Sequence, residues 1–196
     1  MIWKAIVMGA GIVTLAAFSV AGVFRCERGS YRLERTARIA APPGTVQARI
    51  ADLREWTTWP PWQRAGSDRG GKFEGPRSGT GASYSWTGGE ETGSGRLVIV
   101  FAGPEEVRVE SRLEKPRPRT SGFELRLAAD GDGTLVTWTA NCENDRAASL
   151  AELLTGPLPP TAADLEKGLE NLKVVAEAAE EYRIALPTLE APAALW

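Results

Sequence analysis

Histidine is absent from this sequence of 196 residues. Its absence excludes Ser-His-Asp and Cys-His catalytic machinery and removes the commonest transition-metal ligand. Cysteine is scarce: Cys26 and Cys142 lie far apart, and no motif pairs them. Two isolated thiols make neither a disulfide scaffold nor a zinc site, so we interpret Cys142 as an apolar filler and Cys26 as a membrane-edge residue. The sequence therefore predicts no metal and no cofactor.

An excess of charge of one sign is also missing, because 23 basic residues face 25 acidic ones and the net charge is −2. A mildly acidic chain has no electrostatic footprint for nucleic acid, so no nucleic-acid partner is expected. One local basic cluster follows the first apolar segment, where it would meet anionic lipid headgroups. Its members are Arg25, Arg28, Arg32, Arg35 and Arg38.

Long uncharged runs are confined to the N-terminus, where Ala5 to Phe24 carries no charge between Lys4 and Arg25. A helix of this length spans a hydrocarbon core of ~30 Å, and Trp3 stands where an interfacial aromatic residue belongs. Residues 1–28 are therefore predicted to form a transmembrane anchor. We expect a single-pass membrane protein whose domain lies on the exported side.

A cleaved signal peptide is the rival interpretation of the same run. Ser19-Val20-Ala21 offers small residues at the right spacing for cleavage before Gly22. The apolar run exceeds a signal core of ~7–15 residues, which favours the uncleaved anchor. Basic residues flank both ends, so the positive-inside rule leaves the orientation open.

The body of the chain, residues 29–183, is dominated by alternating segments that predict strands. Ten of the 21 glycines fall within residues 66–95 and indicate tight turns, and Asp130 to Gly133 is a hairpin signal. Because these strands follow one another directly, the sheet should be antiparallel. The predicted strands span residues 31–40, 72–74, 82–87, 95–101, 106–113, 122–127 and 134–140.

Two helices and one short helical segment are predicted. The first helix starts at Pro42 to Thr45 and runs through Asp52, and the tryptophan-rich stretch after it ends at Pro60-Pro61. A long helix follows Thr161, whose partner Asp164 suggests a capping pair, and ends near Arg183. Residues 184–196 form a tail. The apolar face of the long helix consists of Leu165, Leu169, Leu172, Val175, Ala176 and Ala179.

This order predicts an α+β fold, in which the long helix must bury its apolar stripe on the concave face of the sheet. The small residues Ala176 and Ala179 on that helix should leave space between helix and sheet. Such a space would be an apolar pocket with few polar groups.

Four stretches within residues 31–183 match one family in order. They are Ile39-Ala40-Ala41-Pro42-Pro43 with Val46; Asp52 to Trp56 with Trp59 and Pro61-Trp62; Gly81, Tyr84, Trp86, Gly93 and Gly95; and Gly133-Thr134-x-Val136-Thr137-Trp138 with Gly168-Leu169-x-x-Leu172-Lys173. In these stretches the chain resembles the SRPBCC superfamily of START-like or helix-grip domains. It is most similar to the bacterial polyketide cyclase/dehydrase-like members.

The resemblance implies a curved antiparallel sheet of about seven strands wrapped around a C-terminal helix, and many such members also have an N-terminal apolar helix. It implies a cavity for lipids, polyketides or other hydrophobic molecules, without implying catalysis. The family usually has a phenylalanine-containing segment before the sixth strand. Here Lys115-Pro116-Arg117-Pro118-Arg119 stands there, which argues against a deep apolar lid.

Ten residues are candidates for the walls of this cavity, and none is assigned a catalytic role. The three tryptophans after the first helix line the cavity mouth or cap the core beneath it. Tyr84 and Trp86 share one face of a strand. Phe101, Phe123 and Trp138 are expected to face the core. The candidates are Trp56, Trp59, Trp62, Tyr84, Trp86, Phe101, Phe123, Trp138, Leu169 and Leu172.

Three functions remain open. The chain is predicted to be a membrane-tethered carrier or sensor of a hydrophobic small molecule. Alternatively, it is a cyclase- or dehydratase-type enzyme on an aromatic or polyketide-like substrate, using Glu74, Glu91 or Tyr84 for proton transfer. Glu124 and Arg126 are expected to face solvent. The third alternative is a protein-interaction module with a filled cavity and an exposed apolar patch.

Overall fold

The structure is a computed structural model, and it describes residues 30–61, 71–88, 93–115, 118–143 and 160–185. The predicted anchor over residues 1–28, most of the predicted tail, Trp62 and Glu91 lie outside the described residues. Within the described parts, no helix combines the length and the apolar character that crossing a membrane requires.

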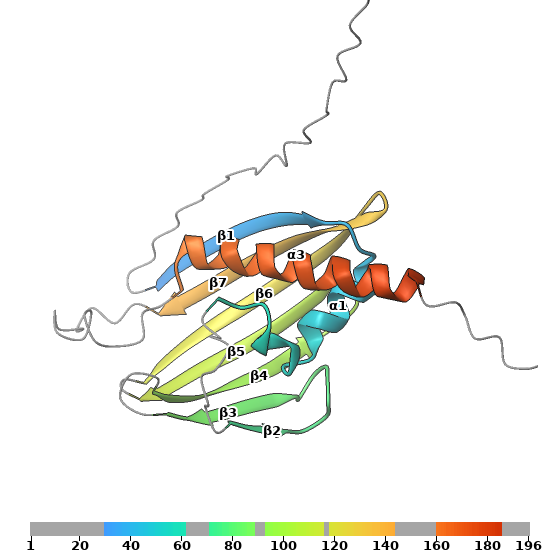
Figure 1. Cartoon of the computed structure of the whole chain (residues 1–196). Coiled ribbons are helices and arrows are strands. Elements are labelled where there is room, and N and C mark those ends of the chain that lie inside the picture. The colour runs from blue at the N-terminus through green and yellow to red at the C-terminus, as the bar shows by residue number, and fades with distance from the viewer. Residues whose placement is uncertain (1–29, 62–70, 89–92, 116–117, 144–159, 186–196) are drawn as a thin grey trace, which may run out of the picture.

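Seven strands form one antiparallel sheet in the order β1-β7-β6-β5-β4-β3-β2, which confirms the predicted fold class (Figure 1). The order places the first strand beside the last, and the hairpins from β2 to β7 follow one another across the sheet. The strands are β1 (Ser30–Ile39), β2 (Gly71–Glu74), β3 (Ser83–Thr87), β4 (Ser94–Ala102), β5 (Glu106–Lys115), β6 (Arg119–Asp130) and β7 (Gly133–Glu143).

The helices α1 (Pro43–Ala51), η1 (Glu55–Thr57) and α3 (Ala162–Ala185) follow the predicted boundaries closely. α1 carries its proline in the first turn, where the missing N–H costs nothing. α3 begins with a reciprocal cap: the Thr161 backbone N–H donates to Asp164 (2.8 Å), and the Asp164 N–H donates to the Thr161 hydroxyl (3.2 Å). Both helices lie on the same face of the sheet (Figure 1).

We call this helix-covered side the inner face and the opposite side the outer face. Alternation along the strands sends Val107, Leu125 and Val136 inward, where they are buried. On the outer face the register places Glu106 opposite Arg126, and Arg108 opposite Glu124. Cross-strand pairs of opposite charge stabilise the sheet on its outer face. Arg126 faces solvent as predicted, whereas Glu124 lies on the same face but its side chain is only 18% exposed.

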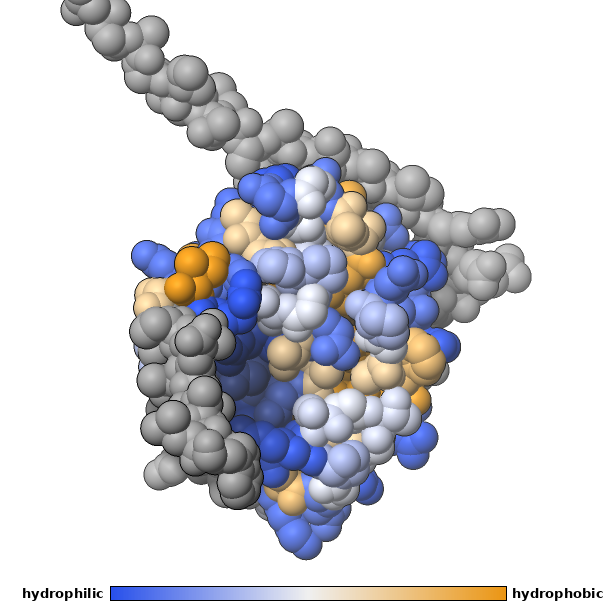
Figure 2. All heavy atoms as spheres, turned by 90° about the vertical axis from the view of Figure 1, so that its right-hand side faces the viewer, coloured by the Kyte–Doolittle hydropathy of each residue, from blue (hydrophilic) through white to orange (hydrophobic). Residues whose placement is uncertain are grey.

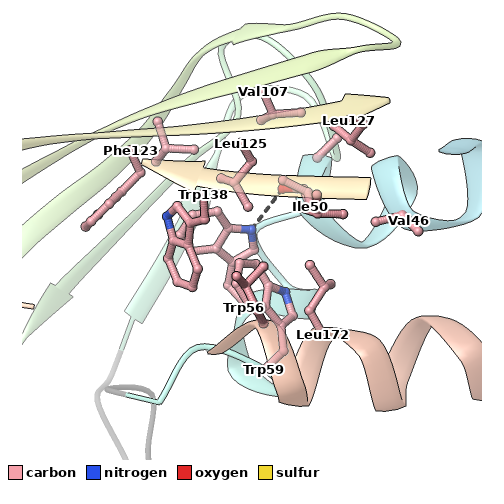
Figure 3. Close-up of a cluster of buried hydrophobic side chains, with 14 of the residues drawn as sticks. Val46, Ile50, Trp56, Trp59, Val107, Phe123, Leu125, Leu127, Trp138 and Leu172 are labelled. Atoms are coloured by element: carbon pink, nitrogen blue, oxygen red, sulfur yellow. Dashed lines mark hydrogen bonds between the residues drawn. The ribbon is translucent and has the colours of Figure 1, made fainter. Parts of the chain in front are cut away.

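Tryptophans dominate the core between the sheet and α3 (Figure 3). Trp59 packs edge-on against Trp56 at a centroid distance of 4.9 Å and against Trp138 at 5.3 Å. The Trp56 indole N–H donates to the Ile50 carbonyl at 2.9 Å, which satisfies that buried donor. The three indoles join η1, the sheet and α3 into one core.

The prediction that Phe101 faces the core is wrong. Leu97 and Ile99 point inward, but the pairing of β4 with β5 shifts register between Ile99 and Phe101. A bulge adds one residue to the strand and reverses which later side chains face inward. Phe101 is therefore 40% exposed on the outer face, where the Arg108 guanidinium lies 4.7 Å from its ring centroid.

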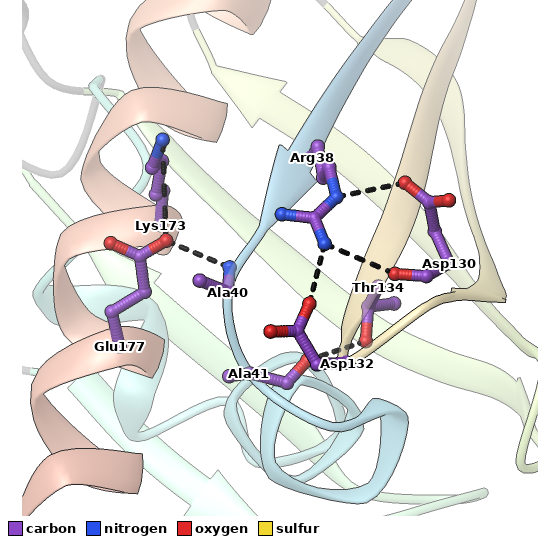
Figure 4. Close-up of polar contacts among 8 residues, drawn as sticks. All are labelled: Arg38, Ala40, Ala41, Asp130, Asp132, Thr134, Lys173 and Glu177. Atoms are coloured by element: carbon purple, nitrogen blue, oxygen red, sulfur yellow. Dashed lines mark hydrogen bonds and ion pairs between the residues drawn. The ribbon is translucent and has the colours of Figure 1, made fainter. Parts of the chain in front are cut away.

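The arginines of the predicted lipid-facing cluster that the structure describes are engaged within the protein. Arg38 bridges the β6–β7 turn by donating to Asp130 (2.9 Å) and Asp132 (2.6 Å; Figure 4). Asp132 first, then Asp130, raises the pKa of Arg38 above its ordinary value. Arg35 lies on the inner side and donates to Glu166 of α3 at 2.7 Å. These arginines therefore serve the fold and point to different faces.

Candidate functional site

The pairing register arranges the inner-face side chains in rows that cross the sheet. α1 contacts β5, β6 and β7, and α3 packs mainly along β1 and against α1. Two rows at the far end of β3–β6 lie beyond the main contacts of both helices. One row runs Trp86, Gly95, Leu113, Arg119, and the next runs Phe73, Tyr84, Leu97, Ser111, Ser121. We call these nine residues the inner platform.

The β2–β3 end of the inner platform is aromatic. The rings of Tyr84 and Trp86 are nearly parallel, with an interplanar angle of 19° and centroids 6.1 Å apart. Phe73 lies 4.7 Å from Tyr84, and the Arg54 guanidinium lies 4.7 Å above the Phe73 ring. All three rings are partly buried against the core. This end therefore offers polarizable ring faces rather than branched aliphatic side chains.

Two glycines make room for these rings. A Cβ atom built on Gly95 would lie 2.7 Å from Cζ2 of Trp86, and one on Gly71 would lie 2.1 Å from the Tyr84 hydroxyl oxygen. Real Cβ contacts are never that short, so any larger residue would push the rings off the sheet. The aromatic side chains consequently lie over bare backbone on neighbouring strands.

The β5–β6 end of the inner platform is polar. Ser111 and Ser121 are directly opposite each other on adjacent strands, and Ser121 is 7% exposed. Arg119 occupies the next inward position of β6, opposite Leu113. The inner platform thus combines stacked rings with hydroxyl and guanidinium groups. Such a surface suits a ligand that carries both apolar and polar groups.

A cluster of charged residues fixes the aromatic end against α1 and η1. The buried carboxylate of Asp52 accepts from the backbone N–H of Arg54 at 2.9 Å and lies 3.4 Å from Nε of Arg77. Arg54 in turn donates to the Arg77 carbonyl at 2.9 Å. The Gly79 N–H donates to the Ala51 carbonyl at 2.8 Å. These bonds hold the β2–β3 connection, and with it Phe73 and Tyr84, against the end of α1.

Beneath α3 the space expected for a ligand is filled at its centre. A Cβ atom on Gly168 would lie 2.4 Å from the Trp138 ring, so the helix rests directly on that indole. Trp138, Trp59 and Leu169 are almost completely buried there, and so is Ala176 farther along α3. A guest molecule has no room at this contact.

The predicted cavity residues therefore separate into distinct groups. Tyr84 and Trp86 lie on the inner platform, whereas Phe101 lies outside and Trp62 is not described. The remaining six belong to the packed core, where Phe123 is the one nearest the inner platform, in the adjacent row beside Ser121. They are Trp56, Trp59, Phe123, Trp138, Leu169 and Leu172.

Of the two carboxylates considered for catalysis, Glu91 lies outside the described residues, and Glu74 does not face the inner platform. Glu74 points to the outer face and accepts from Lys72 at 2.8 Å. Lys72 holds the pKa of Glu74 below its ordinary value, the opposite of what a general acid needs. Tyr84 is the one proposed proton-transfer group that the structure places inward. In the described parts, no three acidic or cysteine side chains are grouped to hold a metal ion.

Sequence reasoning missed the polar half of the inner platform, namely Ser111, Ser121 and Arg119. The signal was present in the strand alternation. Ser111 lies two and four residues after Val109 and Val107 on the same strand, so its side chain points inward as theirs do, although it is polar. A polar residue at a position that the pattern assigns to the core is a sign of function.

A hollow of about 280 Å³ lies on the outer side of the sheet near the β6–β7 hairpin. Glu106, Arg126 and Thr137 contribute to its lining, which mixes charges with a few apolar atoms. It is separated from the inner platform by the sheet itself. Its charged lining suits water better than a hydrophobic ligand.

Exposed apolar side chains are scattered over the described surface. Seen from the end where α3 terminates, hydrophilic residues line a hollow, and apolar ones are interspersed among residues of intermediate hydropathy (Figure 2). The large exposed apolar residues belong to three separate elements, β4, β7 and α3. They are Val100, Phe101, Leu135, Val174, Tyr182 and Ile184. This distribution does not favour one broad protein-binding patch.

Comparison with known proteins gives one family. The sequence model of the family described as polyketide cyclase / dehydrase and lipid transport matches residues 30–177. This range contains all four stretches on which the resemblance was based, and it confirms the predicted superfamily. No curated protein matches the sequence.

Solved structures share the fold at low identity. The protein CV1439 from Chromobacterium violaceum is 16% identical, with a TM-score of 0.50, and the match covers 77% of this chain and 99% of that one. Ara h 8.0201 is 13% identical, with a TM-score of 0.51 and coverages of 79% and 99%. An uncharacterized protein from Rhizobium leguminosarum is 15% identical, with a TM-score of 0.51 and coverages of 80% and 99%.

Proposed function

Because the chain belongs to the polyketide cyclase/dehydrase and lipid transport family, we propose that it binds a hydrophobic small molecule, lipid or polyketide-like, on the inner platform. The bound molecule would be carried or sensed rather than transformed. The platform supplies a binding surface, and its nine residues include no carboxylate.

The observation that carries this proposal is the composition of the inner platform. Inward-facing rings of Phe73, Tyr84 and Trp86 are only partly buried by the rest of the protein. Aromatic side chains of this size carry large apolar surfaces, and the part left uncovered is available to an apolar ligand. Their remaining surface, on the face that the helices otherwise cover, is the natural place for an apolar guest.

Blocking the inner platform tests the proposal. Ser111→Phe adds a ring at an inward, half-buried position of β5, and Ser85→Phe adds the same ring at an outward, half-buried position of β3. Both variants replace one serine with phenylalanine, and they differ only in which face of the sheet the new ring covers. Both are compared with the unchanged protein by native mass spectrometry of the ligand that co-purifies, and by titration with a fluorescent fatty acid.

We expect the unchanged protein and Ser85→Phe to retain the ligand and to bind the probe. Ser111→Phe should lose both by about tenfold or more, because a ring on the platform floor excludes a guest of similar size. Equal binding by all three proteins would contradict the location. A folded, unchanged protein that carries no ligand and binds no probe would contradict the function itself.

The membrane tether is a separate part of the proposal. It is supported by the uncharged run Ala5 to Phe24 between Lys4 and Arg25, and it would hold the domain beside the exported face of the membrane. A single chain can then exchange its ligand with the bilayer without diffusing away. Intact mass measurement of the protein recovered from membranes tests this: a full-length chain supports an anchor, and a chain beginning near Gly22 supports a cleaved signal peptide.

A further inference from the structure

We propose that the domain docks on an anionic lipid bilayer through one end of its sheet, where a row of basic side chains crosses the outer face. We call this end, at which β1 begins and β3, β5 and β7 finish, the entry end, because the chain enters the domain there (Figure 1). The inference adds a membrane surface to the proposed function, and its account of ligand exchange rests on that function. Three observations support it: the basic row, the opposite charge at the other end of the sheet, and the short connection to the uncharged N-terminal run.

The basic row lies between the two rows of the inner platform, so strand alternation points its side chains to the opposite, outer face. Three of its five members are cations and none is an acid. They are Lys72, Ser85, Arg96, Arg112 and Thr120. The exposed Lys115, opposite Ser94, extends this basic surface towards the tip of the entry end. Cations and hydroxyls of this kind are suited to contact phosphate oxygens.

Two of these cations face each other. Arg96 and Arg112 stand directly opposite on β4 and β5, an arrangement of like charges that destabilises a sheet. Neighbouring groups offset part of the repulsion: Arg96 donates to Ser83 at 2.9 Å and lies 3.7 Å from Glu74. Arg112 donates to Glu110. The two arginine side chains remain 48% and 68% exposed, and each guanidinium has five N–H donors. Both can therefore bind lipid phosphates while they keep these contacts.

The other end of the sheet carries the opposite charge. The β4–β5 and β6–β7 turns, with the residues that flank them, hold four acids and no base. The acids are Glu105, Glu106, Asp130 and Asp132. At the entry end, residues 112–115 and Arg119, which close β5 and open β6, hold three bases and one acid, while Arg32 of β1 and Glu143 of β7 balance each other. An anionic surface would attract the entry end and repel the other, which orients the domain.

The connection to the N-terminal run is short. The uncharged run ends at Phe24, and β1 begins at Ser30. Even a fully extended chain covers only about 20 Å over that separation. The headgroup layer is about 5–8 Å thick on each side of a bilayer. A run anchored in the hydrocarbon core would therefore hold the entry end close to the lipid phosphates, and the basic row would set which way the domain faces.

Docking in this orientation serves ligand exchange. The inner platform occupies the same end of the sheet, because Trp86, Gly95 and Leu113 stand in the row nearest the start of β6. Contact at the entry end would bring this row beside the bilayer. A hydrophobic ligand could then move between lipid and platform with little apolar surface exposed to water.

Lysine acetylation of the full-length protein tests the contact, because lysines on different faces report separately. The protein is reconstituted in nanodiscs of phosphatidylcholine, or of phosphatidylcholine mixed with phosphatidylglycerol. Mass spectrometry follows the acetylation rates of Lys72 and Lys115 at the entry end, and of Lys167 and Lys173 on α3. Lys115 is exposed, and the side chains of the other three are 77%, 61% and 43% exposed in the order named.

Two double variants complete the design. Arg96→Gln with Arg112→Gln removes two cations of the basic row. Arg108→Gln with Arg126→Gln removes two cations from the same outer face nearer the acidic end, and it is the matched control. All four arginines lie beside glutamates, so the two double variants disturb similar ion pairs.

In the unchanged protein, Lys72 and Lys115 should react at least about threefold more slowly in the mixed nanodiscs than in phosphatidylcholine, whereas Lys167 and Lys173 keep their rates. Raising NaCl from about 0.1 to about 1 M shortens the screening length from about 10 to about 3 Å and should remove this protection. Each cation near an anionic surface strengthens association about fivefold. The basic-row variant should therefore dock about 25-fold more weakly and lose the protection, and the control variant should keep it.

Equal rates in both lipids for the unchanged protein would overturn the docking. Protection of the α3 lysines instead would do so too, as would protection that survives in the folded basic-row variant. If that variant does not fold, the lipid and salt dependence of the unchanged protein still decides. If the intact mass shows a chain that begins near Gly22, vesicles of the same two compositions replace the nanodiscs, and the same lysine pattern is expected.

Titration with the fluorescent fatty acid separates this inference from the proposed function. Lysine rates that do not depend on the lipid, with fatty-acid binding retained, would overturn the docking and leave the ligand-binding function standing. Protection of Lys72 and Lys115 without any fatty-acid binding would support the docking surface and overturn the ligand-binding function.

Discussion

Replacing Gly168 with alanine tests how tightly α3 rests on the sheet. Gly168 is buried on α3, and a Cβ atom there would lie 2.4 Å from Cζ3 of Trp138 and 3.2 Å from Cδ of Pro61. Trp138 cannot retreat easily, because it is 0% exposed and packs against Trp59 at a centroid distance of 5.3 Å. Either the indole or the helix must shift.

Two effects of opposite sign determine the outcome. Alanine is the better helix former by about 1 kcal/mol, which stabilises the variant. Overpacking a dense core costs about 1–3 kcal/mol, and a methyl group placed against a rigid indole belongs in the upper part of that range. We therefore expect Gly168→Ala to lower the free energy of unfolding by about 1 to 2 kcal/mol net.

Urea unfolding followed by tryptophan fluorescence measures this difference. Ala178→Gly on the exposed side of α3 gives the propensity difference without any packing change. Trp138→Phe should make Gly168→Ala less costly in the double variant, because the smaller ring leaves room for the methyl group. A Gly168→Ala protein that is more stable by about 1 kcal/mol would refute the close contact and would reopen the space beneath α3 to a ligand.

Two further predictions concern a buried carboxylate and the β4 bulge. Arg183 first, then Thr45, lowers the pKa of Glu180 from 4.5 to about 2, so its ionised form stabilises the fold at neutral pH. Glu180→Gln should be the less stable protein at pH 7, and the difference should shrink as acid unfolding is followed from about pH 4.5 towards 2; a constant difference would contradict this. In thermal or urea unfolding, Ile99→Ala should cost about 2–5 kcal/mol and Phe101→Ala under about 1 kcal/mol, because only Ile99 is buried; equal losses would place Phe101 in the core.

The elements themselves could be predicted from the sequence because local rules determine them. Strand alternation, the proline that opens α1 and the Thr161–Asp164 cap each act over a few residues, and each was confirmed. The error at Phe101 arose because a bulge depends on the pairing with β5, which alternation within β4 does not reveal.

The candidate site was less predictable, because packing decides which inward residues are left uncovered. Trp59 and Trp86 are both aromatic residues of the helix-covered side, yet Trp59 is fully buried between Trp56 and Trp138 whereas Trp86 is only partly buried. The sequence also could not show that Gly95 lies beneath Trp86, since that contact crosses between strands. Ser111 and Ser121 could have been found from their parity, had polar residues at inward positions been sought.

The most direct test of ligand binding on the inner platform is an NMR titration of the protein labelled with ¹⁵N in its seven tryptophan indoles. We predict that a hydrophobic probe such as a fatty acid shifts the Trp86 indole N–H signal, because Trp86 lies on the inner platform. The Trp56 indole, already bonded to Ile50, should hardly move. Large shifts at Trp56 and Trp138 with none at Trp86 would place the ligand beneath α3 and contradict the account.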